Sequence, residues 1–241
     1  MARLIYREFP PEAGISYALD CLWSVSVGSD GYGTPSHWVL PDGCYSLAVG
    51  VKADWHIHLR RPVLMPFRAP CQPDEEIVGL RFRPGIVPDA AIRSIRRRLR
   101  PGQTAADVLA TLQDAVRVEA PDPEQRIDRM ISMVRAADGR IALPALAEVV
   151  QLSPRHLERL CLRTVGLRPK GFARVTRLQA VVRRLIAQPQ AKLADCAAEF
   201  GFTDQTHMTR EFSALGHLTP AAYLRTIRDV GFLLENPSKS A

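Results

Sequence analysis

Cysteine is scarce in this sequence, and no two cysteines form a Cys-x-x-Cys pair. The five cysteines, at positions 21, 44, 71, 161 and 196, are odd in number and scattered along the 241 residues. A disulfide framework uses an even set of cysteines, and structural zinc sites use closely spaced cysteine pairs. We therefore expect neither feature, and the sequence predicts no cofactor.

Long apolar runs are also missing. No stretch approaches the roughly 20 apolar residues of a membrane-spanning helix. The first eight residues, Met-Ala-Arg-Leu-Ile-Tyr-Arg-Glu, lack the apolar core of a signal peptide. We therefore expect a cytoplasmic protein without membrane contacts. Apolar residues still make up 46% of the chain, and the length of 241 residues suffices for two globular domains.

Acidic residues become sparse where basic residues are dense. The net charge is +7, and residues 121–241 carry 18 basic against 12 acidic side chains. Within residues 151–185 there are nine basic side chains and one acid, Glu158. A basic stretch of this kind is suited to the phosphates of a nucleic acid.

The N-terminal part contains short apolar segments separated by glycine and proline. Candidate strands span residues 16–27, 38–40, 45–51, 55–59 and 77–83. Short strands with such turns predict a β sandwich or small barrel, which we expect over residues 1–120.

Two segments with helical periodicity follow, 104–118 and 124–137, and Asp122-Pro123 marks a start for the second. Three roles are open for these helices: joining the two halves, forming a dimer contact or completing the N-terminal core. Residues 121–140 are the expected helical linker region.

A repeat occupies the C-terminal third. Leu143–Cys161 and Leu193–Phe212 each contain a short apolar helix, a turn and a second helix with arginine and polar side chains. Each segment is followed eight residues later by a proline, Pro169 or Pro220. Two helix-turn-helix units in tandem predict binding to double-stranded DNA.

Local signals set the expected helix ends in this repeat. Ser153 and Thr203 are the expected N-caps, and Gly201 is expected to take a positive φ between helices. A single helix over residues 172–187 would hold the two units about 34 Å apart, one turn of DNA. We expect four side chains of this helix to stay outside the core: Arg174, Arg177, Arg183 and Arg184.

The second unit has a specific resemblance. Ala197–Phe212, followed by Thr219-Pro220-Ala-Ala-Tyr-Leu-Arg225, resembles the C-terminal signature of the AraC/XylS family of bacterial transcription regulators. The resemblance covers about Ile141 to Arg228. It implies an α+β protein of two domains: a β-rich one and an all-α DNA-binding domain over residues 141–230, with two helix-turn-helix units joined by a long helix and a tail at 231–241.

The N-terminal half resembles a β-rich, cupin-like domain often found before such DNA-binding domains. The resemblance lies in His37-Trp-Val-Leu-Pro-Asp-Gly-Cys44 and Gly79-Leu-Arg-Phe-Arg-Pro-Gly85. Two positions depart from the family pattern. Cys161 stands where most members have a large aromatic residue, and Gly216-His217 replaces an aromatic-glycine pair, so we expect a looser first core and an early end to the last recognition helix.

The resemblance also assigns contact residues, because the family contacts DNA with the early part of each second helix. Carried over by position, the base contacts are Arg155, Arg159, Gln205, Thr206 and Arg210. Arginine can donate two hydrogen bonds to guanine, and glutamine can pair with adenine. Three further residues are the expected phosphate partners: His156, Thr209 and Lys170.

Other groups allow two interpretations each. His56 and His58 have the spacing of a cupin metal site, with His37 or an acid as third ligand, but they also fit an exposed strand edge. Cys44 is either a redox sensor or a small buried side chain. Five aromatic residues either line an effector pocket or fill the core: Tyr17, Trp23, Trp38, Trp55 and Phe67.

We conclude from the sequence that the protein is a DNA-binding transcription regulator and not an enzyme. The family resemblance implies an activator and a homodimer. Our leading hypothesis adds a small-molecule effector that binds the N-terminal domain and gates DNA binding, and RNA polymerase is a further candidate partner. One alternative is a regulator without a ligand. The other is a metal-dependent cupin-like enzyme fused to a DNA-binding domain, which requires a metal at His56 and His58.

Overall fold

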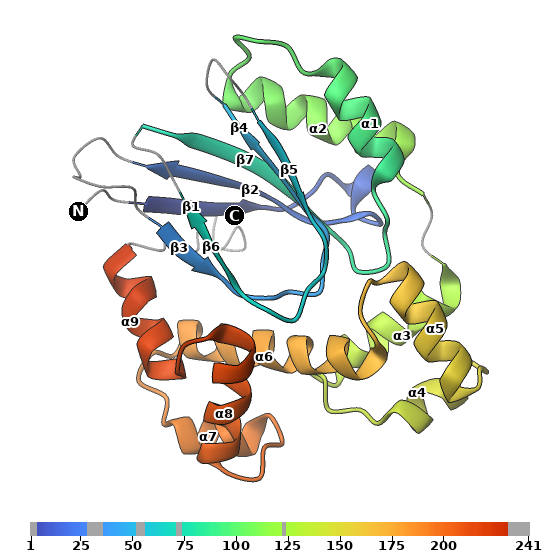
Figure 1. Ribbon diagram of the computed structural model, residues 1–241, viewed down its shortest axis with the longest axis vertical. Helices are drawn as coiled ribbons and strands as arrows, with labels where there is room; N and C mark the ends of the chain where they lie inside the picture. Colours follow the sequence, from blue (N-terminus) through green and yellow to red (C-terminus); the bar gives the residue numbers. More distant parts are fainter. Residues whose placement is uncertain (1–3, 28–35, 52–55, 71–73, 122–123, 231–241) are drawn as a thin grey trace.

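The computed structural model describes residues 4–27, 36–51, 56–70, 74–121 and 124–230. A β-rich part is followed by a part that contains only helices (Figure 1). The predicted α+β fold is thereby confirmed. No helix in the described ranges has the length and apolar character needed to cross a membrane.

Five antiparallel strands form the main sheet, in the order β1-β2-β7-β4-β5, and β3 pairs with β6 in a second sheet. The strands span Leu4–Phe9 (β1), Leu19–Val27 (β2), Ser36–Val39 (β3), Ser46–Gly50 (β4), Ile57–Arg60 (β5), Phe67–Pro70 (β6) and Glu76–Phe82 (β7). The five predicted segments overlap β2, β3, β4, β5 and β7, whereas β1 and β6 were not predicted. Residues 16–18 form a turn after a short 3-10 helix, Ala13–Ile15.

Side chains alternate between the two faces of the sheet. On β7, Val78, Leu80 and Phe82 are fully buried in a core shared with two helices, α1 (Asp89–Arg98) and α2 (Ala105–Glu119). A capping box at Thr104 starts α2. Of the three roles left open for the segment 104–118, the structure has the one that completes the N-terminal core.

The helical part is arranged around one long helix, α6, with α3–α5 towards one end and α7–α9 towards the other (Figure 1). The helices span Gln125–Ala136 (α3), Leu143–Val149 (α4), Pro154–Thr164 (α5), Pro169–Ala187 (α6), Leu193–Glu199 (α7), Gln205–Gly216 (α8) and Pro220–Val230 (α9). The first half of α6 supplies Phe172 and Val175 to the core of the first unit. The second half supplies Leu178, Val181 and Leu185 to the core of the second unit.

The β-rich part packs directly on α6 and contributes to both helical cores. The side chain of Gln179 donates a 2.7 Å hydrogen bond to the carbonyl of Pro41. Leu40 is only 7% exposed and lies in the core of the second unit, while Leu64 packs against both cores. The two helix-turn-helix units are therefore braced by the β-rich part as well as by α6.

Candidate nucleic-acid interface

The predicted repeat is present, and its two copies share the same turn geometry. In the first unit, the amide of Leu152 donates to the carbonyl of Ala147 at 2.9 Å. The equivalent bond in the second unit joins Phe202 to Ala197, also at 2.9 Å. Gly201 has a φ of +68°, as predicted, and Gln151 takes φ +54° at the matching place. Both turns reverse the chain through a left-handed residue.

The two recognition helices start differently. Ser153 caps α5 as predicted, because its hydroxyl accepts from the amide of His156 at 3.3 Å. The prediction of Thr203 for the second unit was wrong by one residue. Asp204 caps α8, accepting from the amide of His207 at 2.7 Å. A carboxylate is the stronger acceptor and also suits the positive end of the helix dipole.

Most predicted contact residues lie on the solvent side of the helices. Exposed are Arg155, His156 and Arg159 on α5, Gln205, Thr206 and Arg210 on α8, and Lys170 on α6, whereas Thr209 is half-buried. Within the described part of the chain, none of these side chains has an ion pair or hydrogen bond. The side chains are therefore available to a ligand. Lys170 stands apart from the others, at the start of α6.

Two further residues share this surface of α5 and were not predicted. Leu162 and Arg163 are both exposed, one turn beyond Arg159. The opposite side of α5 is buried and apolar, with Leu157, Leu160 and Cys161. A helical count from Arg155 and Arg159 would have found both residues, because positions three and four apart fall on one face.

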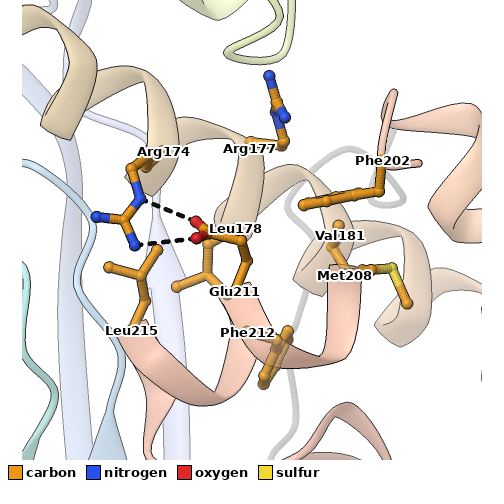
Figure 2. A pocket seen from close by; sticks show the side chains of 9 residues that line it. All are labelled: Arg174, Arg177, Leu178, Val181, Phe202, Met208, Glu211, Phe212 and Leu215. Atoms are coloured by element: carbon orange, nitrogen blue, oxygen red, sulfur yellow. Dashed lines mark hydrogen bonds and ion pairs between the residues drawn. The ribbon is translucent and has the colours of Figure 1, made fainter. Parts of the chain in front are cut away.

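Two arginines that were predicted to stay outside instead hold the second unit on α6 (Figure 2). Arg174 forms a two-pronged contact with Glu211 of α8, with N–O distances of 2.8 and 3.2 Å. The guanidinium of Arg177 lies 5.2 Å from the ring centre of Phe202, and burial lowers its pKa. The planar guanidinium can both stack on a ring and pair with a carboxylate, so these positions favour packing over exposure.

Figure 2 also shows the pocket between α6 and α8 that these arginines line together with apolar side chains such as Leu178 and Phe212. Its volume of about 20 Å³ has room for about one water molecule. This pocket is too small for an organic effector. The other two arginines of α6 lie further along: Arg183 is exposed, and Arg184 pairs with Glu199 at 2.8 Å.

In the β-rich part, the two recognisable sequence phrases meet at a charged cluster. Arg81 lies 3.0 Å from Asp42 and 2.8 Å from Glu8, and it donates to the hydroxyl of Tyr6 at 3.1 Å. Burial raises the pKa of the Asp42 carboxyl, although Arg81 opposes this shift. The cluster therefore ties the turn at residues 41–44 to the middle of the sheet.

A second ion pair, next to this turn, links strand β2 to the helical part. Arg135 of α3 contacts both carboxylate oxygens of Asp20, at 3.0 and 2.5 Å. The thiol of Cys44 lies 3.5 Å from the same carboxylate, and burial raises the pKa of this thiol well above its usual range. A protonated, buried thiol is a poor nucleophile, so the structure favours the packing interpretation of Cys44 over the redox one.

The next candidate group is the pair of histidines considered for a metal site. His56 and His58 have ring centres 4.9 Å apart, and His56 lies 3.7 Å from Glu75. The described residues hold no cluster of three metal-ligating side chains, and the side chain of His37 lies outside them.

The aromatic residues proposed for an effector pocket have separate neighbours. Trp23 stacks on Tyr6, with ring centres 6.3 Å apart, and Trp38 contacts His217 at 5.9 Å. Tyr17 packs against the sheet core, and Phe67 lies under Arg60. Trp55 falls outside the described residues. His217 takes φ +55° directly after α8, so this helix ends at Gly216, where the departure from the family pattern begins.

Comparison with known proteins agrees with this architecture. Residues 146–226 match a family model described as a helix-turn-helix domain. None of the curated proteins matches the chain. Among solved structures, ToxT from Vibrio cholerae is similar, with a TM-score of 0.50 and 10% identity over 81% of this chain and 96% of ToxT.

Wild-type ToxT with a bound unsaturated fatty acid gives a TM-score of 0.45 and 9% identity over 98% of this chain and 97% of that protein. At such identities the likeness is one of fold. A helix-turn-helix domain thus spans residues 146–226 and follows a β-rich part, in a two-domain fold similar to that of ToxT.

Proposed function

We propose that the protein is a sequence-specific DNA-binding transcription regulator that contacts two neighbouring segments of the major groove with α5 and α8. The observation that carries the proposal is the pair of helix-turn-helix units at the two ends of α6, each with exposed polar side chains on its second helix. Such a helix places its N-terminal residues against base edges in the major groove.

Base recognition is assigned to the exposed face of each second helix. On α5, Arg155 and Arg159 are one turn apart and are suited to guanine, to which arginine donates two hydrogen bonds. On α8, Gln205 is suited to adenine, and Arg210 to guanine. Thr206 adds a hydroxyl and a methyl group to the same surface. Three side chains are assigned to phosphates, which position the protein without specifying sequence: His156, Thr209 and Lys170.

The length of α6 supports simultaneous contact by both units. Its 19 residues extend over about 28 Å at 1.5 Å per residue. Successive major-groove segments on one face of DNA are about 34 Å apart. The length of α6 is therefore comparable with one turn of DNA.

The turn at residues 41–44 is the proposed route from the β-rich part to the DNA-binding half. It contacts α6 through Pro41 and Gly43, and its neighbours Asp20 and Arg81 carry the charged contacts described above. A signal that shifts this turn would change the contact with α6, and α6 positions both units. Coupling free energies between allosterically linked sites are typically about 1–3 kcal/mol.

Four further features extend the proposal through the AraC/XylS resemblance. They are activation of transcription, a homodimer, RNA polymerase as a protein partner and a small-molecule effector at the β-rich part. The cytoplasm is the proposed location, since the protein would act on DNA there.

Selection from a random DNA library, followed by sequencing and salt titration of the enriched duplex, tests the proposal. The full chain is compared with an Arg159→Ala, Arg210→Ala double variant. A matched control, Arg96→Ala with Arg97→Ala, removes the same charge from exposed positions on α1. We expect a bipartite motif, with boxes about ten base pairs apart, that the control keeps and the double variant loses.

One result of this experiment would contradict the proposed function. If retained DNA shows no motif, and moderate salt abolishes binding of the wild type and both variants alike, the basic half is an electrostatic patch only. The proposed function would then be wrong.

A further inference from the structure

The surface of α5 that faces solvent contains one apolar side chain among charged ones. Leu162 is 48% exposed, whereas the other apolar side chains of α5, Leu157, Leu160 and Cys161, are buried. Leu162 also belongs to none of the hydrophobic clusters of the described chain, not even as a partly buried neighbour. Its exposed area therefore has no packing role within the described fold.

The position of Leu162 on the helix places it beside the proposed base contacts. At 100° per residue, Leu162 lies about 20° around the helix from Arg155 and about 60° from Arg159. Arg163 flanks the same face. The apolar side chain thus lies on the same side of α5 as Arg155 and Arg159, one turn beyond Arg159.

Base chemistry restricts what an apolar side chain can contact there. Base edges in the major groove present hydrogen-bond donors and acceptors, with one apolar exception, the C5-methyl group of thymine. Leucine against a donor or acceptor would remove water from that group without replacing its hydrogen bond, which is unfavourable. Leucine against the methyl group buries apolar surface on both partners.

We infer that Leu162 contacts a thymine methyl group and so adds one A·T base pair to the sequence that the first unit recognises. This inference rests on the proposed function. It assigns a specificity contact to a side chain that can form no hydrogen bond to a base.

Single replacements of thymine by deoxyuridine test the contact, because they remove the methyl group and leave every base pair intact. The enriched duplex carries one replacement at a time and is titrated with the full-length wild type, Leu162→Ala and Val118→Ala. Val118 is 65% exposed on α2 and serves as the matched control for loss of an exposed apolar side chain. Thermal unfolding of each variant checks that the fold is intact.

We expect one deoxyuridine position, in the box of the first unit, to weaken wild-type binding about fourfold. This is the effect expected from burying one methyl-sized apolar group. Leu162→Ala should lose this penalty at that position alone, while Val118→Ala keeps it. If no position shows a penalty that Leu162→Ala abolishes, the inference is wrong. That result differs from failure of the proposed function, in which no duplex is enriched at all.

Discussion

A methyl group added at Gly43 tests whether the turn at residues 41–44 is seated tightly on α6. Gly43 has a φ of +74°, and a Cβ at this position would lie 2.9 Å from two ring atoms of Phe172. Phe172 is 1% exposed, so its ring has little room to move away. Gly43→Ala therefore combines a backbone penalty with a steric one.

The two penalties can be worked out separately. A left-handed conformation costs a residue with a Cβ about 1–2 kcal/mol, and overpacking of a filled core costs about 1–3 kcal/mol. We expect Gly43→Ala to lower the free energy of unfolding by about 2–5 kcal/mol as the sum of these terms. Urea denaturation of the full chain, followed by the midpoint and slope, measures the change.

A second substitution distinguishes strain from collision. Phe172→Leu shortens the side chain that the new methyl group meets. The loss of unfolding free energy in the double variant should therefore be smaller than the sum of the two single losses, by about 1 kcal/mol or more. If the two changes add within about 0.5 kcal/mol, the methyl group meets no obstacle. The close seating of the turn on α6 would then be refuted.

Three other predictions concern the DNA contacts, the ion pair and the buried thiol. Arg159→Ala and Arg210→Ala should each weaken binding to the enriched duplex by about 1–3 kcal/mol and relax the preference at one base pair, measured by titration against single-base variants. A double-mutant cycle of Asp20→Ala and Arg135→Ala on urea midpoints should give a coupling above about 0.5 kcal/mol, because the side chains are only 22% and 38% exposed; a coupling near zero would contradict a structural role. Burial raises the pKa of the Cys161 thiol from 9.0 to about 12. The unfolded thiol loses its proton near pH 9 while the native thiol keeps it, so stability should fall as pH rises from about 9 towards 12. This slope, followed by urea unfolding, should be smaller in Cys161→Ala, and an unchanged slope would count against the assignment.

Much of the helical part could be predicted because its signals are local. The periodicity over residues 104–118 and 124–137 matches α2 and α3 within one or two residues. Ser153 followed by proline fixed the start of α5, and Gly201 fixed the turn of the second unit. Such positions depend on backbone conformation and neighbouring amides, both of which are encoded within a few residues.

Features that depend on distant partners could not be predicted. The arginine at position 174 has the spacing of an exposed residue, and only the tertiary fold brings Glu211 to it. Leu40 looks like the end of a strand, yet it fills the core of the second unit. The helix α1 was not predicted, because its four arginines mask an apolar face of Ala91, Ile92 and Ile95. A count at helical spacing would have revealed this face.

The two units differ in the side chains that they present, and this difference gives the protein a polarity. One chain carries the arginines of α5 at one end of α6 and the glutamine and arginine of α8 at the other. Under the proposed contacts, the DNA site of a single chain would not be equivalent to its own reverse complement. Each site would therefore determine the direction along the DNA in which the β-rich part points. Inverting the site within a promoter would turn that part to face the opposite direction.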